Sequence, residues 1–549
     1  REASFKQASA PAAARTAVRA QAEPGDTPVG TVRAWRTSDN LTGEFFFRDY
    51  QLRGLGDHIE VWVAVGPATS HGVTASGLDF PPGDCRNDGV RNVITQQQVD
   101  YFVNQFETNI YPKESAVFSV PEERNGTNAD PRAGDTTGGG DNIVTLVENI
   151  RDDNFYDKNN ANSLLYILGY FGGNDFNDRN TMVIDGFDWL HRTTANPPHA
   201  PTNNPCTSQP ARPFLLEATY AHEYQHLLLA YEDQNEIAWV NEGLSDWAQT
   251  LTGYTDTTKN ATQLGFDRHV NCLQGFLRIA TEFNPIPSEA CGPENSLTLW
   301  GDPGSILADY GATYTFMLFL ADRYGTAFMT SLHRDDANSL DGVQNALNRF
   351  APGTSVQDVI HDWAAMLAVD KTLDGMRFLG KRAKRVQSAS LHSEVLWDNP
   401  FAYDTPGAPP NGSDYVRLRG ADGHYLAARD LTSLSFKAPT HLDPDPVQWT
   451  VDRNPPQRAG DAALYSGQAI NINAAIATPV TVPAGSPTLT LDTRYETEKG
   501  YDIGYVQVST DGGRSYTNLT NAHIDPAIGG FTGDSHGWVT ETFDLSAYA

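Results

Sequence analysis

The feature that most constrains this chain is the stretch His222-Glu223-Tyr224-Gln225-His226, in which two histidines stand four residues apart. In an α-helix this spacing places both imidazoles on one face, about one turn apart, so that both can reach a single ion. Apolar residues precede and follow the stretch, which predicts a buried helix. Burying two histidines and a glutamate without partners is unfavourable. The sequence therefore predicts a metal site on a core helix, with Glu223 beside it.

A third ligand must come from a later residue, and two glutamates compete for the role. Glu232 follows the second histidine by six residues, but Leu229 stands where a glycine would have to turn the chain. An unbroken helix would carry Glu232 away from the ligand face. Glu242 follows the polar stretch 231–236, which predicts a turn, and lies near the start of a second predicted helix. We therefore expect Glu242 to complete the set with His222 and His226.

Asp246 follows Glu242 by about one helical turn, so the two side chains are expected to face the same way. A metal-bound histidine usually donates its other ring N–H to a carboxylate or a carbonyl. We therefore expect Asp246 to hold the ring of His222. An acid on an ordinary helix surface is the alternative interpretation.

Three protein ligands leave a fourth position for water, which is typical of a catalytic zinc site. Zinc lowers the pKa of that water and polarises a carbonyl group, and Glu223 is placed to take the proton and pass it to a leaving amine. A developing oxyanion needs a further donor. Tyr310 is the first choice and Tyr314 the second, both in the apolar segment 308–320. The alternative is that these tyrosines are packing residues, each with a satisfied hydroxyl group.

The combination of His222-Glu223-x-x-His226 and Asn241-Glu242-x-x-Ser245-Asp246 resembles the gluzincin peptidases. Longer segments are similar to the hyicolysin-type secreted bacterial neutral metallopeptidases, namely 178–185, 188–192, 221–226 and 239–246. The resemblance covers residues 90 to 375. It implies a zincin-like fold and a zinc endopeptidase in which His222, His226 and Glu242 are ligands and Glu223 is the base.

Two further comparisons with gluzincins concern the substrate and the tyrosine. The Y-x-x-G pattern of the gluzincin aminopeptidases supports Tyr310 only in part, because Gly311 follows directly and the fourth position is Thr313. The G-A-M-E-N signature of the exopeptidases, which recognises a free amino terminus, is absent from the sequence. The resemblance therefore implies an endopeptidase.

The C-terminal part resembles a different appendage. Segments 463–467 and 505–513 are similar to the jelly-roll module of immune inhibitor A-type bacterial peptidases. Leu229 replaces the glycine of that group's catalytic motif, so we expect the module to be shared and the ligand set to differ. Such a sandwich would continue beyond Ala549, and the sequence therefore predicts a module that is cut short.

At 549 residues the chain is expected to form two to four domains. The patterns predict an α+β protein with a zincin-like domain of mixed sheet and active-site helices, followed by an all-β sandwich. The expected parts are a disordered segment or propeptide remnant at 1–27, a β-rich region at 28–90, the catalytic domain at 91–390 and the jelly-roll-like region at 412–549.

A net charge of −29 and a pI of about 4.7 argue against nucleic-acid partners and against docking to anionic membranes. No apolar run approaches the ~20 residues that a membrane-spanning helix needs. The four cysteines form no C-x-x-C pair, which argues against a zinc–thiolate site. We favour disulfides Cys272–Cys291 and Cys85–Cys206, with free thiols in a cytosolic enzyme as the alternative. Low lysine content and the peptidase resemblance favour secretion.

Two other segments carry expectations. Asp152, Asp153 and Asp157 offer oxygen ligands for a structural calcium ion, although their spacing matches no EF-hand loop and a solvated acidic loop is the simpler interpretation. Residues 181–185 predict a strand that lines the substrate site, with an edge to which an extended peptide can add.

The expected function is a secreted zinc endopeptidase that hydrolyses extracellular proteins or peptides. One alternative is an extracellular protein whose C-terminal β region binds polysaccharide or a cell surface, with an incidental zinc domain. The presence of Glu223 argues against it, because a non-catalytic site does not need a base. The other alternative is a zinc hydrolase of a non-peptide amide or ester.

Overall fold

A computed structural model describes most of the chain. The described residues are 27–138, 140, 142–159, 166–204, 206–301, 306–374, 384–403, 409–435, 449–458, 460–467, 474–497, 502–513, 515–524 and 528–549. The predicted disordered segment 1–27 lies outside this part of the chain except for Thr27. The chain divides into two compact units, unit 1 within Arg1–Leu431 and unit 2 within Thr432–Ala549.

Unit 1 contains both strands and helices, so the chain is α+β. Its strands are β1 (Val32–Asp39), β2 (Glu44–Leu55), β3 (Ile59–Ala64), β4 (Pro67–Ser70), β5 (Val73–Ser76), β6 (Ile143–Glu148), β7 (Gly169–Phe171) and β8 (Thr181–Asp185). Its helices are α1 (Gln96–Gln105), the π-helix η1 (Phe106–Ile110), α2 (Tyr111–Val117), α3 (Asp153–Tyr156), α4 (Trp189–Arg192), α5 (Leu215–Glu232), α6 (Ala238–Thr252), α7 (Arg268–Leu273), α8 (Ile306–Tyr324), α9 (Thr326–His333), α10 (Leu340–Phe350) and α11 (Val356–Leu373), besides short 3₁₀ turns.

One mixed sheet organises unit 1, with strand order β1-β2-β3-β6-β8-β7. β6 lies parallel to β3 and to β8, whereas β7 runs antiparallel to β8. Every residue of β6 and β8 is buried, as expected for parallel strands that are covered on both faces. The sheet therefore joins strands of the segment 28–90 to strands that come after residue 91.

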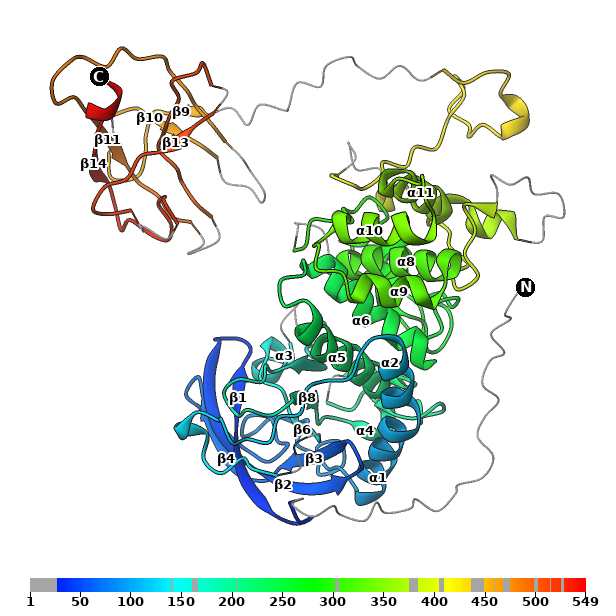
Figure 1. Ribbon diagram of the computed structural model, residues 1–549. Helices are drawn as coiled ribbons and strands as arrows, with labels where there is room; N and C mark the ends of the chain where they lie inside the picture. Colours follow the sequence, from blue (N-terminus) through cyan, green and yellow to red (C-terminus); the bar gives the residue numbers. More distant parts are fainter. Residues whose placement is uncertain are drawn as a thin grey trace. The chain divides into compact units, whose positions relative to one another are not determined.

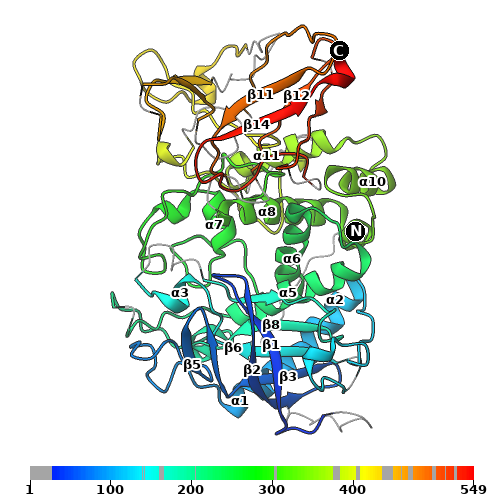
Figure 2. The ribbon, with the colours of Figure 1, turned by 90° about the vertical axis from the view of Figure 1, so that its left-hand side faces the viewer.

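Helices α1 and α5 pack together against this sheet. The ring of Tyr220 in α5 lies 5.0 Å from the ring of Phe102 and 5.5 Å from that of Phe106. The Tyr220 hydroxyl also shares a buried hydrogen bond with Thr145 of β6. Figures 1 and 2 show the sheet at one end of unit 1 and α8 to α11 at the other, with α5 and α6 between them. No described helix is both long enough and apolar enough to cross a bilayer.

Unit 2 is described as short antiparallel strand pairs around a small apolar core. The pairs are β9 (Thr450–Asp452) with β10 (Ala463–Tyr465), β11 (Thr488–Thr493) with β14 (Val539–Asp544), and β12 (Gln507–Val508) with β13 (Thr517–Asn518). The core is built from Leu519, Ile524, Phe531, Phe543 and Leu545. Within the described residues of this unit no sheet exceeds two strands, so the jelly-roll sandwich stays a prediction.

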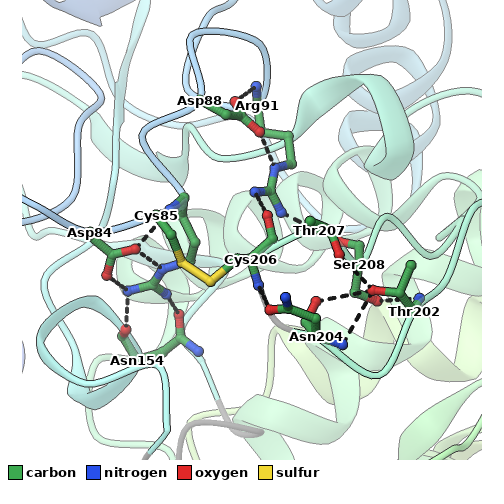
Figure 3. Close-up of a disulfide and its surroundings, with 11 residues drawn as sticks. Asp84, Cys85, Asp88, Arg91, Asn154, Thr202, Asn204, Cys206, Thr207 and Ser208 are labelled. Carbon is green, nitrogen blue, oxygen red and sulfur yellow. Dashed lines mark hydrogen bonds and ion pairs between the residues drawn. A yellow bond between two sulfur atoms is a disulfide. The ribbon is translucent and has the colours of Figure 1, made fainter.

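Two disulfides cross-link unit 1. They are Cys85–Cys206 and Cys272–Cys291, which is the pairing that the sequence favours. Cys85–Cys206, which Figure 3 draws, joins the loop before α1 to the loop between α4 and α5. The second bond joins α7 to the loop that precedes α8.

The disulfide Cys85–Cys206 lies inside a hydrogen-bonded ion-pair network (Figure 3). Arg91 donates to Asp88 at 2.6 Å and to the carbonyl of Cys206 at 2.5 Å. Arg86, the neighbour of Cys85, forms a salt bridge of 2.9 Å with Asp84. The two loops are thus held by a covalent bond and by buried guanidinium groups, which satisfy loop carbonyls that would otherwise lack donors.

Candidate metal centre

Helix α5 carries the two histidines and the glutamate of the motif. It begins after Phe214, whose backbone is left-handed (φ 54°), and ends at Glu232, before Asp233. Most of its residues are buried because it contacts β7 and β8 as well as α6. His222 and Glu223 are buried, at 8% and 6% exposure. The predicted core helix is therefore present.

Helix α6 returns alongside α5 and brings Glu242 to the histidines. Gly243, the next residue, lies where α6 crosses α8. A Cβ atom at this position would stand 2.9 Å from Cγ of Met317 and 3.2 Å from the carbonyl oxygen of Thr313. The glycine therefore permits the close approach of α6 to α8. The competing residue Glu232 ends α5 with its side chain exposed and belongs to no ligand group.

The three predicted ligands meet at one point. The Nε2 atoms of His222 and His226 are 3.0 Å apart. The Oε2 atom of Glu242 lies 3.1 Å from Nε2 of His222 and 3.4 Å from Nε2 of His226. Among the described residues, this is the one group of three His, Cys, Asp or Glu side chains close enough to share an ion.

The opposite ring nitrogens are held by neighbouring groups. Nδ1 of His222 lies 2.9 Å from Oδ1 of Asp246, and Nδ1 of His226 lies 2.7 Å from Oδ1 of Asn241. Both partners are oxygen acceptors, so each Nδ1 donates to its partner and each Nε2 faces the other ligand atoms. Asp246 thus contacts His222 as the sequence predicts. Asn241, in contrast, was not singled out, although it precedes Glu242 directly.

This arrangement fits a bound cation. Burial lowers the pKa of both histidines, but Asp246 and Glu242 raise that of His222 and Glu242 raises that of His226, so each ring attracts a proton that a bound cation would replace. Ligand atoms about 2.0–2.2 Å from a tetrahedral zinc ion would stand about 3.3–3.6 Å apart, slightly farther than the 3.0–3.4 Å found here. Burial would raise the pKa of Glu242, but His226 and His222 lower it well below its usual range. The carboxylate is therefore charged and available as a ligand.

Glu223 lies against β7, the short edge strand. A Cβ atom at Gly169 would stand 3.1 Å from Cγ of Glu223 and 2.9 Å from Cγ2 of Thr219, so glycine allows β7 to approach α5. The Glu223 carboxylate accepts a hydrogen bond from the backbone of Phe171. Burial raises the pKa of Glu223, although the two histidines oppose the rise. The carboxyl group is thus a stronger base than an exposed glutamate.

Of the two predicted tyrosines, Tyr310 lies at the ligand group. Its ring is 6.2 Å from that of His222, and its hydroxyl group bonds to Glu242. Burial and the nearby carboxylates raise its pKa well above the usual value, so the hydroxyl keeps its proton and can donate. Tyr314 is fully buried and shares a hydrogen bond of 2.5 Å with Thr250 instead.

His269 is a residue that the sequence reasoning missed. Its Nδ1 lies 2.8 Å from Oδ2 of Asp246, and its ring stacks on Tyr310 at 4.5 Å. The neighbouring Gly311 makes this possible, because a Cβ atom there would stand 2.2 Å from the His269 carbonyl oxygen. The glycine directly after Tyr310, which the Y-x-x-G pattern does not contain, thus permits the contact of α8 with α7. No spacing in the sequence connects His269 to the motif.

The expectation that a peptide can add to the edge of residues 181–185 is wrong. This strand, β8, pairs with β6 on one side and with β7 on the other, so it has no free edge. Among the described strands, β7 is the last of the sheet on this side. Its three residues and initial glycine are too short a signal for a strand prediction.

The predicted calcium ligands lie around α3. Asp152 caps this helix by accepting from the backbone N–H of Phe155, and its second oxygen accepts from Ile167. Both carboxylate oxygens therefore have donors. The calcium site stays a prediction, and residues 160–165 next to it lie outside the described chain.

No protein-family model matches the chain. A segment of 97 residues, 16% of the chain, is 36% identical to proteins described as pre-pro-metalloprotease PrtV from two Vibrio cholerae serotype O1 strains, M66-2 and ATCC 39315 / El Tor Inaba N16961. The match spans 10% of the length of each relative. This partial similarity supports a relationship to metallopeptidases.

Proposed function

We propose that the chain is a zinc-dependent endopeptidase. The observation that carries the proposal is the convergence of His222, His226 and Glu242 on one point, with Glu223 buried on the same helix beside a sheet edge. The similarity to metalloproteases supports the reaction class. Two imidazoles and one carboxylate form a donor set that suits zinc with an open fourth position.

The residues around the site have separable roles in the proposed reaction. A bound zinc ion supplies Lewis acidity to a water molecule and to the substrate carbonyl. Glu223 takes the proton of the attacking water and then delivers it to the leaving nitrogen. The hydroxyl of Tyr310 donates to the oxyanion that develops on the carbonyl oxygen. Asp246 fixes the ring of His222, and His269 holds Asp246 and Tyr310 in place.

The substrate is proposed to bind along β7. Within the described chain, no strand pairs with the outer side of β7. An extended peptide can hydrogen-bond to an exposed strand edge through its main chain, whatever its side chains. Because Glu223 contacts Gly169 and Phe171 of this strand, a peptide bound there runs past the proposed base.

Secretion forms part of the proposal. It is supported by the two disulfides, which persist in oxidising compartments. The negative net charge of −29 suits a protein that stays dissolved outside the cell.

The test is hydrolysis of casein by the purified chain, with and without a zinc chelator, beside Glu223→Gln. We expect the chelator to abolish activity and zinc to restore it. Glu223→Gln should bind one zinc ion per chain and lose at least about a hundredfold in kcat, within the range for a lost general base. Metal content is measured by atomic spectroscopy on the same samples.

The matched control is Glu232→Gln, an exposed glutamate on the same helix, which should keep wild-type activity. Persistent activity in Glu223→Gln would show that another group is the base. A zinc-loaded wild type that cleaves no peptide but hydrolyses amides or esters in a substrate panel would replace the endopeptidase proposal with the non-peptide one.

A further inference from the structure

Three arginines surround one tyrosine near the metal-ligand group. Arg192 ends α4, Arg212 precedes α5 and Arg268 begins α7. The guanidinium carbon of Arg192 lies 4.8 Å from the ring centroid of Tyr166. Burial alone would raise the pKa of the Tyr166 phenol, but the charges of Arg192, Arg212 and Arg268 lower it. The cluster is a concentrated positive charge in a protein whose net charge is −29.

Arg212 and Arg268 form no ion pair with a carboxylate of the described residues, although the charge of Asp267 acts on Arg268. Arg192 forms an ion pair of 2.7 Å with Asp185. Across the described residues, no carboxylate lies within ion-pair distance of the Arg212 or Arg268 guanidinium, although both side chains are partly buried. Burial and the charge of Arg212 lower the pKa of Arg268 to about 10, which leaves Arg268 protonated at neutral pH. A partly buried guanidinium without a partner is unfavourable, and a bound anion would relieve it.

The pair lies beside the proposed reaction site. A Cβ atom at Gly265, just before α7, would stand 3.6 Å from Cγ of Pro213, so the segment before Arg268 lies next to the residue that follows Arg212. His269, the residue after Arg268, contacts Asp246 and stacks on Tyr310. Tyr166 comes three residues before Gly169, about 10 Å along an extended chain. The phenol on which these charges act therefore stands no more than about 10 Å along the chain from Gly169, where Glu223 meets β7.

We propose that Arg212 and Arg268, with Tyr166 beside them, form a subsite that binds a carboxylate of the peptide substrate. The inference rests on the proposed function and adds specificity to it. Guanidinium groups bind carboxylates through paired, charge-assisted hydrogen bonds. In a peptide the carboxylate comes either from a Glu or Asp side chain near the cleaved bond or from the C-terminus.

The experiment uses blocked alanine-based hexapeptides that carry one Glu or one Gln at each position in turn, and an all-alanine peptide with either a free or an amidated C-terminus. Two readouts are taken: kcat/KM for the wild type, and the Kd for zinc-loaded Glu223→Gln. We expect one Glu peptide to exceed its Gln partner, or the free acid to exceed the amide, by about ten- to a hundredfold, the range for charge-assisted hydrogen bonds. The first pattern identifies a side chain, the second the C-terminus.

The variants Arg212→Gln and Arg268→Gln should each bring that ratio close to one, while Arg212→Lys and Arg268→Lys retain part of it. The control is Arg132→Gln, an arginine that is 77% exposed and should leave the ratio unchanged. Because a Gln variant could fail to fold, the wild-type ratio is also measured against salt. It should fall as salt screens the partly exposed charges.

Equal kcat/KM values for all peptides in the wild type, with equal Kd values in zinc-loaded Glu223→Gln, would overturn the subsite even if casein is cleaved. A ratio that survives both Gln variants in folded protein would do the same. If no peptide is cleaved but Glu223→Gln still binds one acidic peptide more tightly through Arg212 and Arg268, the endopeptidase proposal fails and the carboxylate site stands.

Discussion

A single buried carboxylate connects the metal-ligand group to the groups around it. Asp246 has no exposed surface, and its two oxygens contact different histidines, His222 and His269. Gln249 donates a third hydrogen bond to it at 2.7 Å. Burial raises the pKa of Asp246, but His269 and His222 lower it by more than burial raises it. The carboxylate therefore stays charged. The orientation of His222, a proposed metal ligand, and that of the stacked Tyr310 therefore depend on the same residue.

Another buried histidine, His333, contacts the helix α5 that carries the motif. His333 has no exposed surface and lies 3.4 Å from the amide of Gln225, which is itself bonded to Ser245 beside His226. Burial and the charge of Arg334 lower the pKa of His333 to about 3. The ring is therefore neutral in the folded protein at all moderately acidic pH values.

This predicts an acid-sensitive stability. Between pH 6.5 and 3 the unfolded chain protonates His333 and the folded chain does not, so the unfolding free energy falls as pH falls, by about 1.4 kcal/mol per unit from this residue. Above pH 6.5 His333 is neutral in both the folded and the unfolded chain, so it no longer makes the unfolding free energy depend on pH. When the unfolding free energy is measured by urea unfolding from pH 4 to 8, it should change less with pH for His333→Gln than for wild type. The exposed His424→Gln serves as control, and equal slopes in all three would contradict the assignment.

At the scale of elements, four helices bring the site together through close contacts at glycines. Gly243 lets α6 meet α8, and Gly311 lets α8 meet α7. The first contact sets the position of Glu242 and the second that of His269 against Tyr310. Gly169 plays the same part between β7 and α5. Three different interfaces thus place ligands, base and tyrosine within reach of one another.

Gly243→Ala tests the contact of α6 with α8, because the direction of the stability change shows whether the two helices are closely packed there. In an open helical position this change stabilises by about 0.5–1 kcal/mol, because alanine is the better helix former. Here the added Cβ meets Met317 and the backbone of Thr313, so we expect destabilisation of about 1–3 kcal/mol, as for an overpacked core. Gly243→Val should lose more. Thermal unfolding measures both, and a stabilised alanine variant would show that α6 and α8 separate freely there.

The sequence predicts the elements that carry a local signal and misses those that depend on packing. Helix α5 and the start of α6 follow from the spacing of His222, His226 and Glu242, because ligands on adjacent helical turns must face one way. Residues far from the motif, such as His269, reach it only through the contact of α7 with α8. The edge strand was misassigned because β8 has a clear apolar pattern and the three residues of β7 have none.

At the scale of the molecule, the sheet and the disulfides tie distant segments of unit 1 together. Strand β3, from the first part of the chain, pairs with β6, and Cys85–Cys206 links cysteines 121 residues apart. Cys272–Cys291 spans only 19 residues. The two cross-links therefore restrict the unfolded chain to different extents.

Chain entropy predicts the order of their effects. Replacing Cys85 and Cys206 by alanine should lower the unfolding free energy by about 5 kcal/mol, and replacing Cys272 and Cys291 by about 3 kcal/mol. Denaturant unfolding of the two double variants measures the difference, and each variant is the control for the other. A larger loss for the shorter loop would show that native contacts around α7, rather than loop length, decide the effect.

The order of these parts along the chain has a consequence for synthesis. The ligands stand within two adjacent helices, α5 and α6, but His269 and Tyr310 leave the ribosome later. A nascent chain that ends before α7 can hold the motif without the ring that orients Asp246 or the hydroxyl at Glu242. The groups proposed to act on peptide bonds are thus complete only after the sheet that positions them has been synthesised. The proposed activity therefore begins later in synthesis than the formation of the motif helix.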